Sequence, residues 1–112
     1  MSITEARRAP RRNPHGAIAV SDTMTGRIIG RVGNVSEAGM LLVANTPVRE
    51  DALYQLQFTL PASATTRETS IEVGAHLLWT GAANTPGHAL AGLRFLTVSP
   101  AHLEALRDWV GG

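Results

Sequence analysis

The stretch RVGNVSEAGMLLV, residues 31–43, contains two short apolar runs separated by a polar corner. The first run belongs to the longer pattern RIIGRVGNV (27–35), and the second begins the pattern GMLLVA (39–44). Asparagine, serine and glycine are ordinary turn residues, and short runs rich in branched apolar residues favour β-strands. The stretch therefore predicts two neighbouring strands joined by a tight turn.

Four further segments have the character of strands: AIAVS (17–21), LYQLQFTL (53–60), IEVGAHLLW (71–79) and HALAGLRFLTV (88–98). Side chains alternate between the two faces of a strand, so every second residue shares a face. In the 71–79 segment, one face carries Ile71, Val73, Ala75, Leu77 and Trp79. Six short strands with turns between them predict an all-β fold, a small six-stranded antiparallel β-barrel.

The chain changes period after the sixth segment. Ser99 is a good helix cap, Pro100 suits the first helical position, and Gly111 ends the run. Apolar residues at helical spacing follow the cap: Leu103, Leu106 and Val110. We expect a C-terminal helix over residues 99–110 that caps the barrel or packs beside it, with Trp109 in helix packing or on a partner surface.

The composition indicates a single globular domain of 112 residues. The absence of cysteine excludes disulfides and thiolate zinc sites. No apolar run approaches the ~20 residues needed to cross a bilayer, and the polar N-terminus lacks a signal segment. We expect a cytoplasmic protein without membrane insertion, with a flexible Arg-rich arm over residues 1–16 and the barrel with its helix over residues 17–112.

Charge is concentrated at the N-terminus. Residues 1–12 carry four arginines against one glutamate, whereas the rest of the chain carries six arginines against eight acids. All ten basic residues are arginine. A GC-rich genome would explain that preference, and so would a need for guanidinium groups, which bind phosphates and guanine edges bidentately as lysine cannot.

Catalytic patterns are missing from the sequence. The histidines His15, His76, His88 and His102 are scattered without metal-binding spacing. No serine lies in a nucleophile-elbow motif, and there is no phosphate-binding loop of the Walker type. We therefore expect a protein that is not an enzyme and that needs no cofactor or metal.

Two short motifs remain. RRAPRR (7–12) satisfies an R-x-x-x-R spacing twice, as Arg7/Arg11 and as Arg8/Arg12. It is either a plain basic tail or a clamp for an anion. In the corner Asn34-x-Ser36-x-x-Gly39, extended backbone would place the asparagine and serine side chains on one face. Glycine at the third position suits either positive φ or a close backbone approach.

The two motifs together resemble the signature of the PilZ domain family, the bacterial receptors for cyclic di-GMP. That signature is R-x-x-x-R in an N-terminal loop followed by [D/N]-x-S-x-x-G at a strand boundary. Here the matching residues are Arg8 to Arg12 and Asn34 to Gly39. The segments GMLLV, LLWTG and GLRFL are also similar to family members. The resemblance implies a PilZ-type six-stranded antiparallel barrel with a C-terminal helix.

The resemblance also implies roles for single residues. Arg8 and Arg12 would hold guanine edges and phosphate, Asn34 and Ser36 would hydrogen-bond the ligand, and Gly39 would shape the turn. Arg7 and Arg11 fit the same spacing. We favour Arg8/Arg12, because relatives often carry a further arginine just before the first motif residue, a feature that accompanies binding of an intercalated ligand dimer.

Trp79 has two interpretations. It is either a core residue near the end of the barrel or, as in some similar proteins, a contact for a guanine. With these residues we expect a single-domain cyclic di-GMP receptor that relays the signal to an unidentified partner protein by ordering its arm.

One alternative is a PilZ-like adaptor in pilus or motility assembly that binds no ligand. The other is a small barrel that binds nucleic acid through its basic arm. We disfavour the latter, because aromatic residues make up only 4% of the chain and few are available for base stacking.

Overall fold

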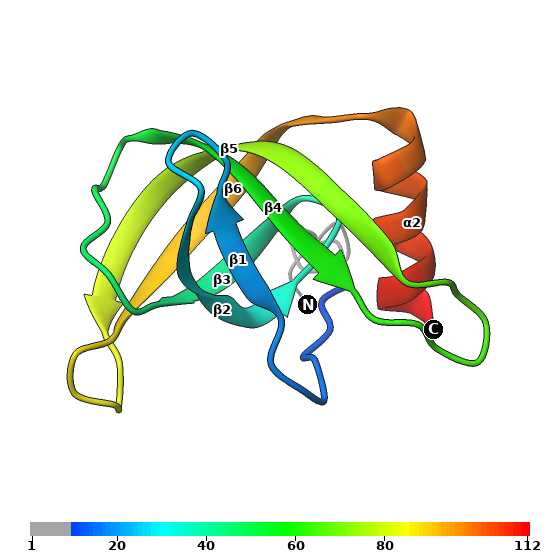
Figure 1. The fold of residues 1–112 in the computed structure, drawn as a ribbon, viewed down its shortest axis with the longest axis horizontal. Coiled ribbons are helices and arrows are strands. Elements are labelled where there is room, and N and C mark those ends of the chain that lie inside the picture. Colours follow the sequence, from blue (N-terminus) through cyan, green and yellow to red (C-terminus); the bar gives the residue numbers. More distant parts are fainter. Residues whose placement is uncertain (1–9) are drawn as a thin grey trace, which may run out of the picture.

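The computed structural model describes residues 10–112, which form a closed β-barrel with one helix beside it (Figure 1). Neighbouring strands are antiparallel and follow the closed order β1-β2-β3-β6-β5-β4. The strands are β1 (Ala19–Asp22), β2 (Arg27–Val35), β3 (Gly39–Ala44), β4 (Leu53–Leu60), β5 (Thr69–Ala82) and β6 (Ala89–Val98), and the helix is α2 (Pro100–Gly111). The predicted fold class, a six-stranded antiparallel barrel with a C-terminal helix, is confirmed.

The barrel interior is filled by apolar side chains from all six strands. The rings of Phe58 and Phe95 stack across it with their centroids 6.4 Å apart. Burying one large apolar side chain contributes about 1.5–3 kcal/mol, and this term offsets the cost of ordering the backbone. Among the largest fully buried side chains are Phe58, Met40, Leu42, Leu56, Leu60, Ile71 and Leu77.

The helix α2 closes the end of the barrel where β4 ends and β5 begins (Figure 1). Ser99 caps its N-terminus, because the Ser99 side chain accepts a hydrogen bond from the His102 N–H at 3.3 Å. Gly112 ends the helix by donating its N–H to the Asp108 carbonyl at 3.0 Å, one residue later than predicted. Leu106 and Trp109 are buried and join the barrel core, so Trp109 is a packing residue.

The strand pairing is irregular at four places among the described strands, and two of these β-bulges change which side chains face outward near the ends of β2 and β5. One lies between Val32 and Asn34 in β2, and the other lies between Leu77 and Trp79 in β5. An extra residue in one strand reverses the faces of the residues that follow it. The prediction that Trp79 shares a face with Leu77 is therefore wrong: Leu77 is 0% exposed and Trp79 is 45% exposed.

The strand boundaries follow the predicted ones with small shifts. β1 starts at Ala19 instead of residue 17, and β6 starts at Ala89 instead of residue 88. β5 is longer than the predicted 71–79 segment, because it pairs with β4 from Thr69 and with β6 as far as Ala82. This long strand connects the helix end of the barrel to the region around Trp79.

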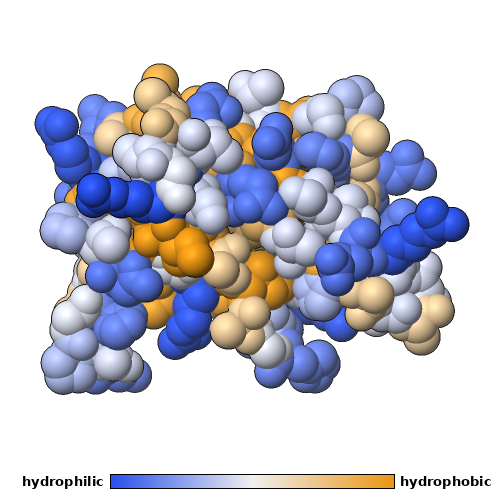
Figure 2. Space-filling model, viewed as in Figure 1, coloured by the Kyte–Doolittle hydropathy of each residue, from blue (hydrophilic) through white to orange (hydrophobic). Residues whose placement is uncertain are grey.

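The barrel surface mixes polar and apolar side chains, as Figure 2 shows for one face. Met24, Ile28 and Leu53 are large apolar residues that remain exposed. In the part of the chain that the structure describes, no helix is long and apolar enough to span a membrane.

Candidate functional site

A row of directly paired residues crosses four strands on the outside of the barrel. Asn34 in β2 is opposite Leu41 in β3, and Leu41 is opposite Gly92 in β6. Gly92 is in turn opposite Trp79 in β5. Both ends of the row depend on a bulge, because regular alternation from Val32 and Leu77 would turn Asn34 and Trp79 inward. The two bulges therefore bring a polar and an aromatic side chain to one outer surface.

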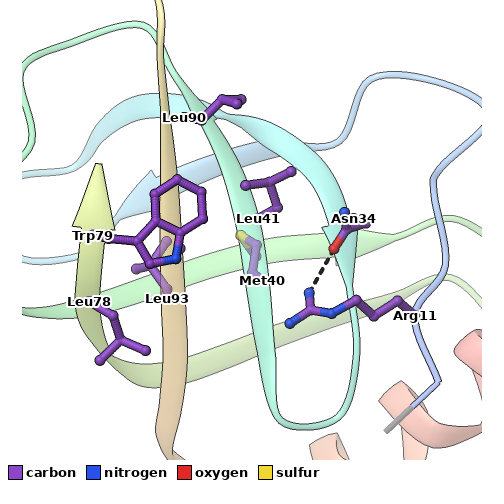
Figure 3. A pocket seen from close by; sticks show the side chains of 9 residues that line it. Arg11, Asn34, Met40, Leu41, Leu78, Trp79, Leu90 and Leu93 are labelled. Carbon is purple, nitrogen blue, oxygen red and sulfur yellow. Dashed lines mark hydrogen bonds between the residues drawn. The ribbon is translucent and has the colours of Figure 1, made fainter. Parts of the chain in front are cut away.

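This row forms the floor of a pocket of about 340 Å³. Arg11 reaches it from the segment before β1, and its Nη1 donates a hydrogen bond to Asn34 Oδ1 at 2.7 Å. Figure 3 shows Arg11 and Asn34 on one side of the pocket and Trp79 on the other, with Met40 and Leu41 between them. The described lining residues are Arg11, Asn34, Met40, Leu41, Leu78, Trp79, Leu90, Gly92 and Leu93.

The chemistry of the pocket is cationic and aromatic. Among the described residues that line it, Arg11 alone carries a charge. The Trp79 indole offers a flat surface on which an aromatic ring can stack, and Arg11 offers a planar donor group for an anion or a ring edge. Within residues 10–112, no three His, Cys, Asp or Glu side chains gather closely enough to hold a metal ion. The pocket is therefore suited to an anionic ligand with a flat ring.

The polar corner after β2 is a compact turn held by its own side chain. Ser36 Oγ accepts hydrogen bonds from the backbone N–H groups of Ala38 at 3.1 Å and Gly39 at 3.2 Å. Ser36 follows the last strand residue, so strand alternation no longer fixes its direction, and its hydroxyl turns inward instead of sharing the face of Asn34. The serine is 1% exposed, and it stabilises the corner that follows Asn34.

Gly39 is required by a close approach of two strands. It is absent from the residues with positive φ, and a Cβ atom at this position would overlap the backbone carbonyl oxygen of Leu93 in β6. Of the two uses expected for this glycine, the structure shows the close approach. Gly39 thereby lets β3 and β6 lie side by side beneath the pocket.

Arg12 points to a different part of the molecule from Arg11. Its backbone forms an isolated bridge with Val35, with N–O distances of 3.0 and 3.1 Å. Its guanidinium carbon lies 4.3 Å from the centroid of the Trp109 ring, and its Nη1 donates to the Trp109 carbonyl oxygen. The predicted site residues Arg7 and Arg8 lie outside the described residues. Of the predicted set, the structure brings together Arg11, Asn34 and Trp79.

Sequence interpretation did not identify six of the described pocket residues: Met40, Leu41, Leu78, Leu90, Gly92 and Leu93. None belongs to a polar motif, and apolar residues in strands are usually assigned to the core. Leu41 and Leu90 are half-buried on the outer face of the barrel. Only the pairing between strands, with its two bulges, identifies them as neighbours of Asn34 and Trp79.

Comparisons with known proteins agree with this architecture. The structure of the Bacillus subtilis inhibitor of motility MotI/DgrA superposes with a TM-score of 0.75 at 15% identity, covering 93% of this chain and 48% of that one. The chain thus spans about half the length of that protein. The PilZ domain with c-di-GMP of YcgR from Escherichia coli superposes with a TM-score of 0.66 at 18% identity, covering 94% of this chain and 88% of that one. At these identities the likeness shows a shared fold.

Sequence comparison identifies the family. No curated protein matches the sequence significantly. The sequence profile of the PilZ domain, however, matches residues 5–112, which is nearly the whole chain. The chain belongs to the PilZ domain family.

Proposed function

We propose that this protein is a receptor that binds cyclic di-GMP in the pocket between Arg11, Asn34 and Trp79. The observation that carries the proposal is the hydrogen-bonded Arg11–Asn34 pair, which faces an exposed tryptophan across one pocket. Membership of the PilZ family supports it, and so does the likeness to a YcgR domain whose structure contains c-di-GMP.

The ligand chemistry matches these side chains. Cyclic di-GMP carries two phosphodiester charges and two guanine rings. The guanidinium of Arg11 can donate two parallel hydrogen bonds to the O6 and N7 acceptors of a guanine or to a phosphate. The Asn34 side chain accepts a hydrogen bond from Arg11 and thereby orients the guanidinium. Trp79 supplies the surface on which a guanine stacks, a contact worth about 1–3 kcal/mol per base.

The working arginine pair in this proposal is Arg7 and Arg11. This choice replaces the initial preference for Arg8 and Arg12. The contact of Arg12 with Trp109 supports the change. Because its guanidinium is held against Trp109 of α2, Arg12 does not line the pocket between Asn34 and Trp79. Arg12 then anchors the arm, Ser36 and Gly39 hold the corner, and Arg7 adds a second guanidinium to the ligand.

The size of the pocket supports a role for the arm. At about 340 Å³ the pocket lies at the low end of the range for small-molecule sites. Cyclic di-GMP, bound singly or as an intercalated dimer, would extend beyond it. We propose that the arm orders over the ligand and changes the surface offered to a partner protein, with no chemistry performed on the ligand.

Calorimetric titration of cyclic di-GMP tests the proposal. The wild type is expected to bind with a dissociation constant below the millimolar range, and Arg11→Ala should weaken binding by about tenfold or more. Arg27→Ala is the matched control, since Arg27 is an exposed arginine at the opposite end of β2 from Asn34. Cyclic di-AMP is the matched ligand control, because adenine lacks the O6 acceptor.

Three results would contradict the proposal. Wild-type binding weaker than millimolar would favour the adaptor that works without a ligand. Equal affinity of the wild type, Arg11→Ala and Arg27→Ala would move the site away from the pocket. Equal affinity for the two cyclic dinucleotides would show that the protein does not recognise the guanine edge.

A further inference from the structure

We infer that Gly92 is a positioning residue for the ligand site: its missing side chain lets the Trp79 indole rest on β6 and present its free side to a base. This inference rests on the proposed function, and it assigns the stacking geometry to a residue with no polar group. Gly92 is buried in the structure, whereas the tryptophan paired with it is 45% exposed.

The contact between the two residues is close. A Cβ atom built on Gly92 would overlap Nε1 of Trp79 and would stand 2.5 Å from Cε2 and 2.9 Å from Cδ1. These three atoms belong to the five-membered ring of the indole, which therefore lies directly over the glycine. Real Cβ atoms do not approach other heavy atoms this closely, so any residue other than glycine at position 92 must displace the indole.

The bulge in β5 explains why the indole meets this glycine. Regular pairing after Leu77 and Leu93 would place Leu78 opposite Gly92. The extra residue shifts the register, and Trp79 takes that place on the outer face. Bulge and glycine thus act together: one turns the indole outward, and the other gives it a flat backbone surface.

Gly39 and Gly92 differ in what an added side chain would displace, and this difference distinguishes a glycine needed for the fold from one needed for the site. A Cβ at Gly39 would overlap a backbone oxygen, Leu93 O, which cannot move without parting two strands. A Cβ at Gly92 would instead meet a side chain, and an indole with one exposed side can rotate away. Alanine at position 92 should therefore leave the barrel folded and disturb the stacking surface.

Gly81 provides a matched control on the same side chain. A Cβ there would lie 3.5 Å from Cζ3 and 3.9 Å from Cε3 of Trp79, which is ordinary van der Waals contact. Gly81→Ala and Gly92→Ala thus add the same methyl group beside the same indole. Only the second change requires the ring to move.

The experiment measures the indole and the ligand separately. In ¹⁵N-labelled protein without ligand, the two tryptophans give two indole N–H signals, assigned with Trp79→Phe. Gly92→Ala should shift the Trp79 signal and leave that of Trp109 in place, and Gly81→Ala should shift neither substantially. Titration with cyclic di-GMP should then show about tenfold or more weaker binding in Gly92→Ala and a change below about threefold in Gly81→Ala.

A double variant covers the case in which Gly92→Ala fails to fold. With Trp79→Ala the overlap disappears, so Trp79→Ala and Trp79→Ala/Gly92→Ala should fold alike and bind cyclic di-GMP within about twofold of each other. The inference is overturned if Gly92→Ala binds like the wild type, or if Gly92→Ala weakens binding equally in both backgrounds. Failure of the wild type to bind overturns the proposed function as well.

Discussion

Arg11 and Arg12 are neighbours in the sequence, but their side chains contact different parts of the structure. Arg11 is exposed at an open pocket, where it contacts Asn34. Arg12 is half-buried, with its backbone paired to Val35 and its guanidinium over the Trp109 ring. Successive side chains of extended backbone point in opposite directions, so one arginine reaches the pocket and the other reaches the helix. Two identical side chains in one motif can therefore divide binding and anchoring between them.

The two tryptophans repeat the same division. Trp79 is 45% exposed and borders the pocket, whereas Trp109 is 2% exposed and fills the end of the barrel. Arg11 and Trp79 line the same pocket and form the pocket pair, whereas Arg12 contacts Trp109 and forms the helix pair with it. The pocket pair should control affinity, and the helix pair should control stability.

The largest effect is expected from Trp109→Ala. Removing a buried tryptophan should lower the free energy of unfolding by about 3–5 kcal/mol, because a cavity opens in the core and Arg12 loses its ring. Chemical denaturation followed by circular dichroism measures this loss. Trp79→Ala is the control, with an expected cost below about 1.5 kcal/mol for a half-exposed ring. Similar losses of unfolding free energy in Trp109→Ala and Trp79→Ala would contradict the assignment of stability to Trp109 alone.

The next effect should separate the two arginines by stability alone. Arg12→Ala should lower the free energy of unfolding by about 1–2 kcal/mol, since a cation–π contact and a hydrogen bond to the Trp109 carbonyl are lost. Arg11→Ala should change it by less than about 0.5 kcal/mol, because Arg11 is exposed. The same denaturation measurement compares them. A larger loss for Arg11→Ala than for Arg12→Ala would reverse the assignment.

The smallest effect concerns the link between the corner and the helix. Glu37 in the corner forms an ion pair with Arg107 in α2, and both side chains are partly exposed. Exposed pairs contribute about 0–1 kcal/mol, so Glu37→Gln should cost less than about 1 kcal/mol and the cost should vanish at about 1 M salt. Denaturation at low and high salt measures this. A cost that persists at high salt would show that Glu37 acts through packing instead of charge.

The fold was predictable because its signals are local. Alternation in the 53–60 segment, the Ser99 cap and the corner at Asn34 each depend on a few consecutive residues, and all three predicted the observed elements. The bulges at Gly33 and Leu78 were not predictable in this way. A bulge depends on how two strands are paired, and a period-2 pattern places Trp79 on the wrong face.

The candidate site was predictable only in part. The motif spacing named Arg11, Asn34 and Trp79 among its candidates, but it fitted Arg7/Arg11 and Arg8/Arg12 equally well. Only the tertiary contact with Trp109 distinguishes Arg12 from Arg11. Gly92 begins the family-like segment GLRFL, but it carries no functional group and its position under Trp79 depends on strand pairing, so the sequence did not identify it as a site residue.

The most direct test of the central claim is a titration of the ¹⁵N-labelled wild type with cyclic di-GMP, followed through its two indole N–H signals. We predict that the Trp79 signal shifts and saturates with the ligand and that its change exceeds that of Trp109, because in the proposed complex a base stacks on the pocket indole. A Trp79 signal that does not shift at any concentration of cyclic di-GMP would contradict the account, whether or not other signals show that the ligand binds.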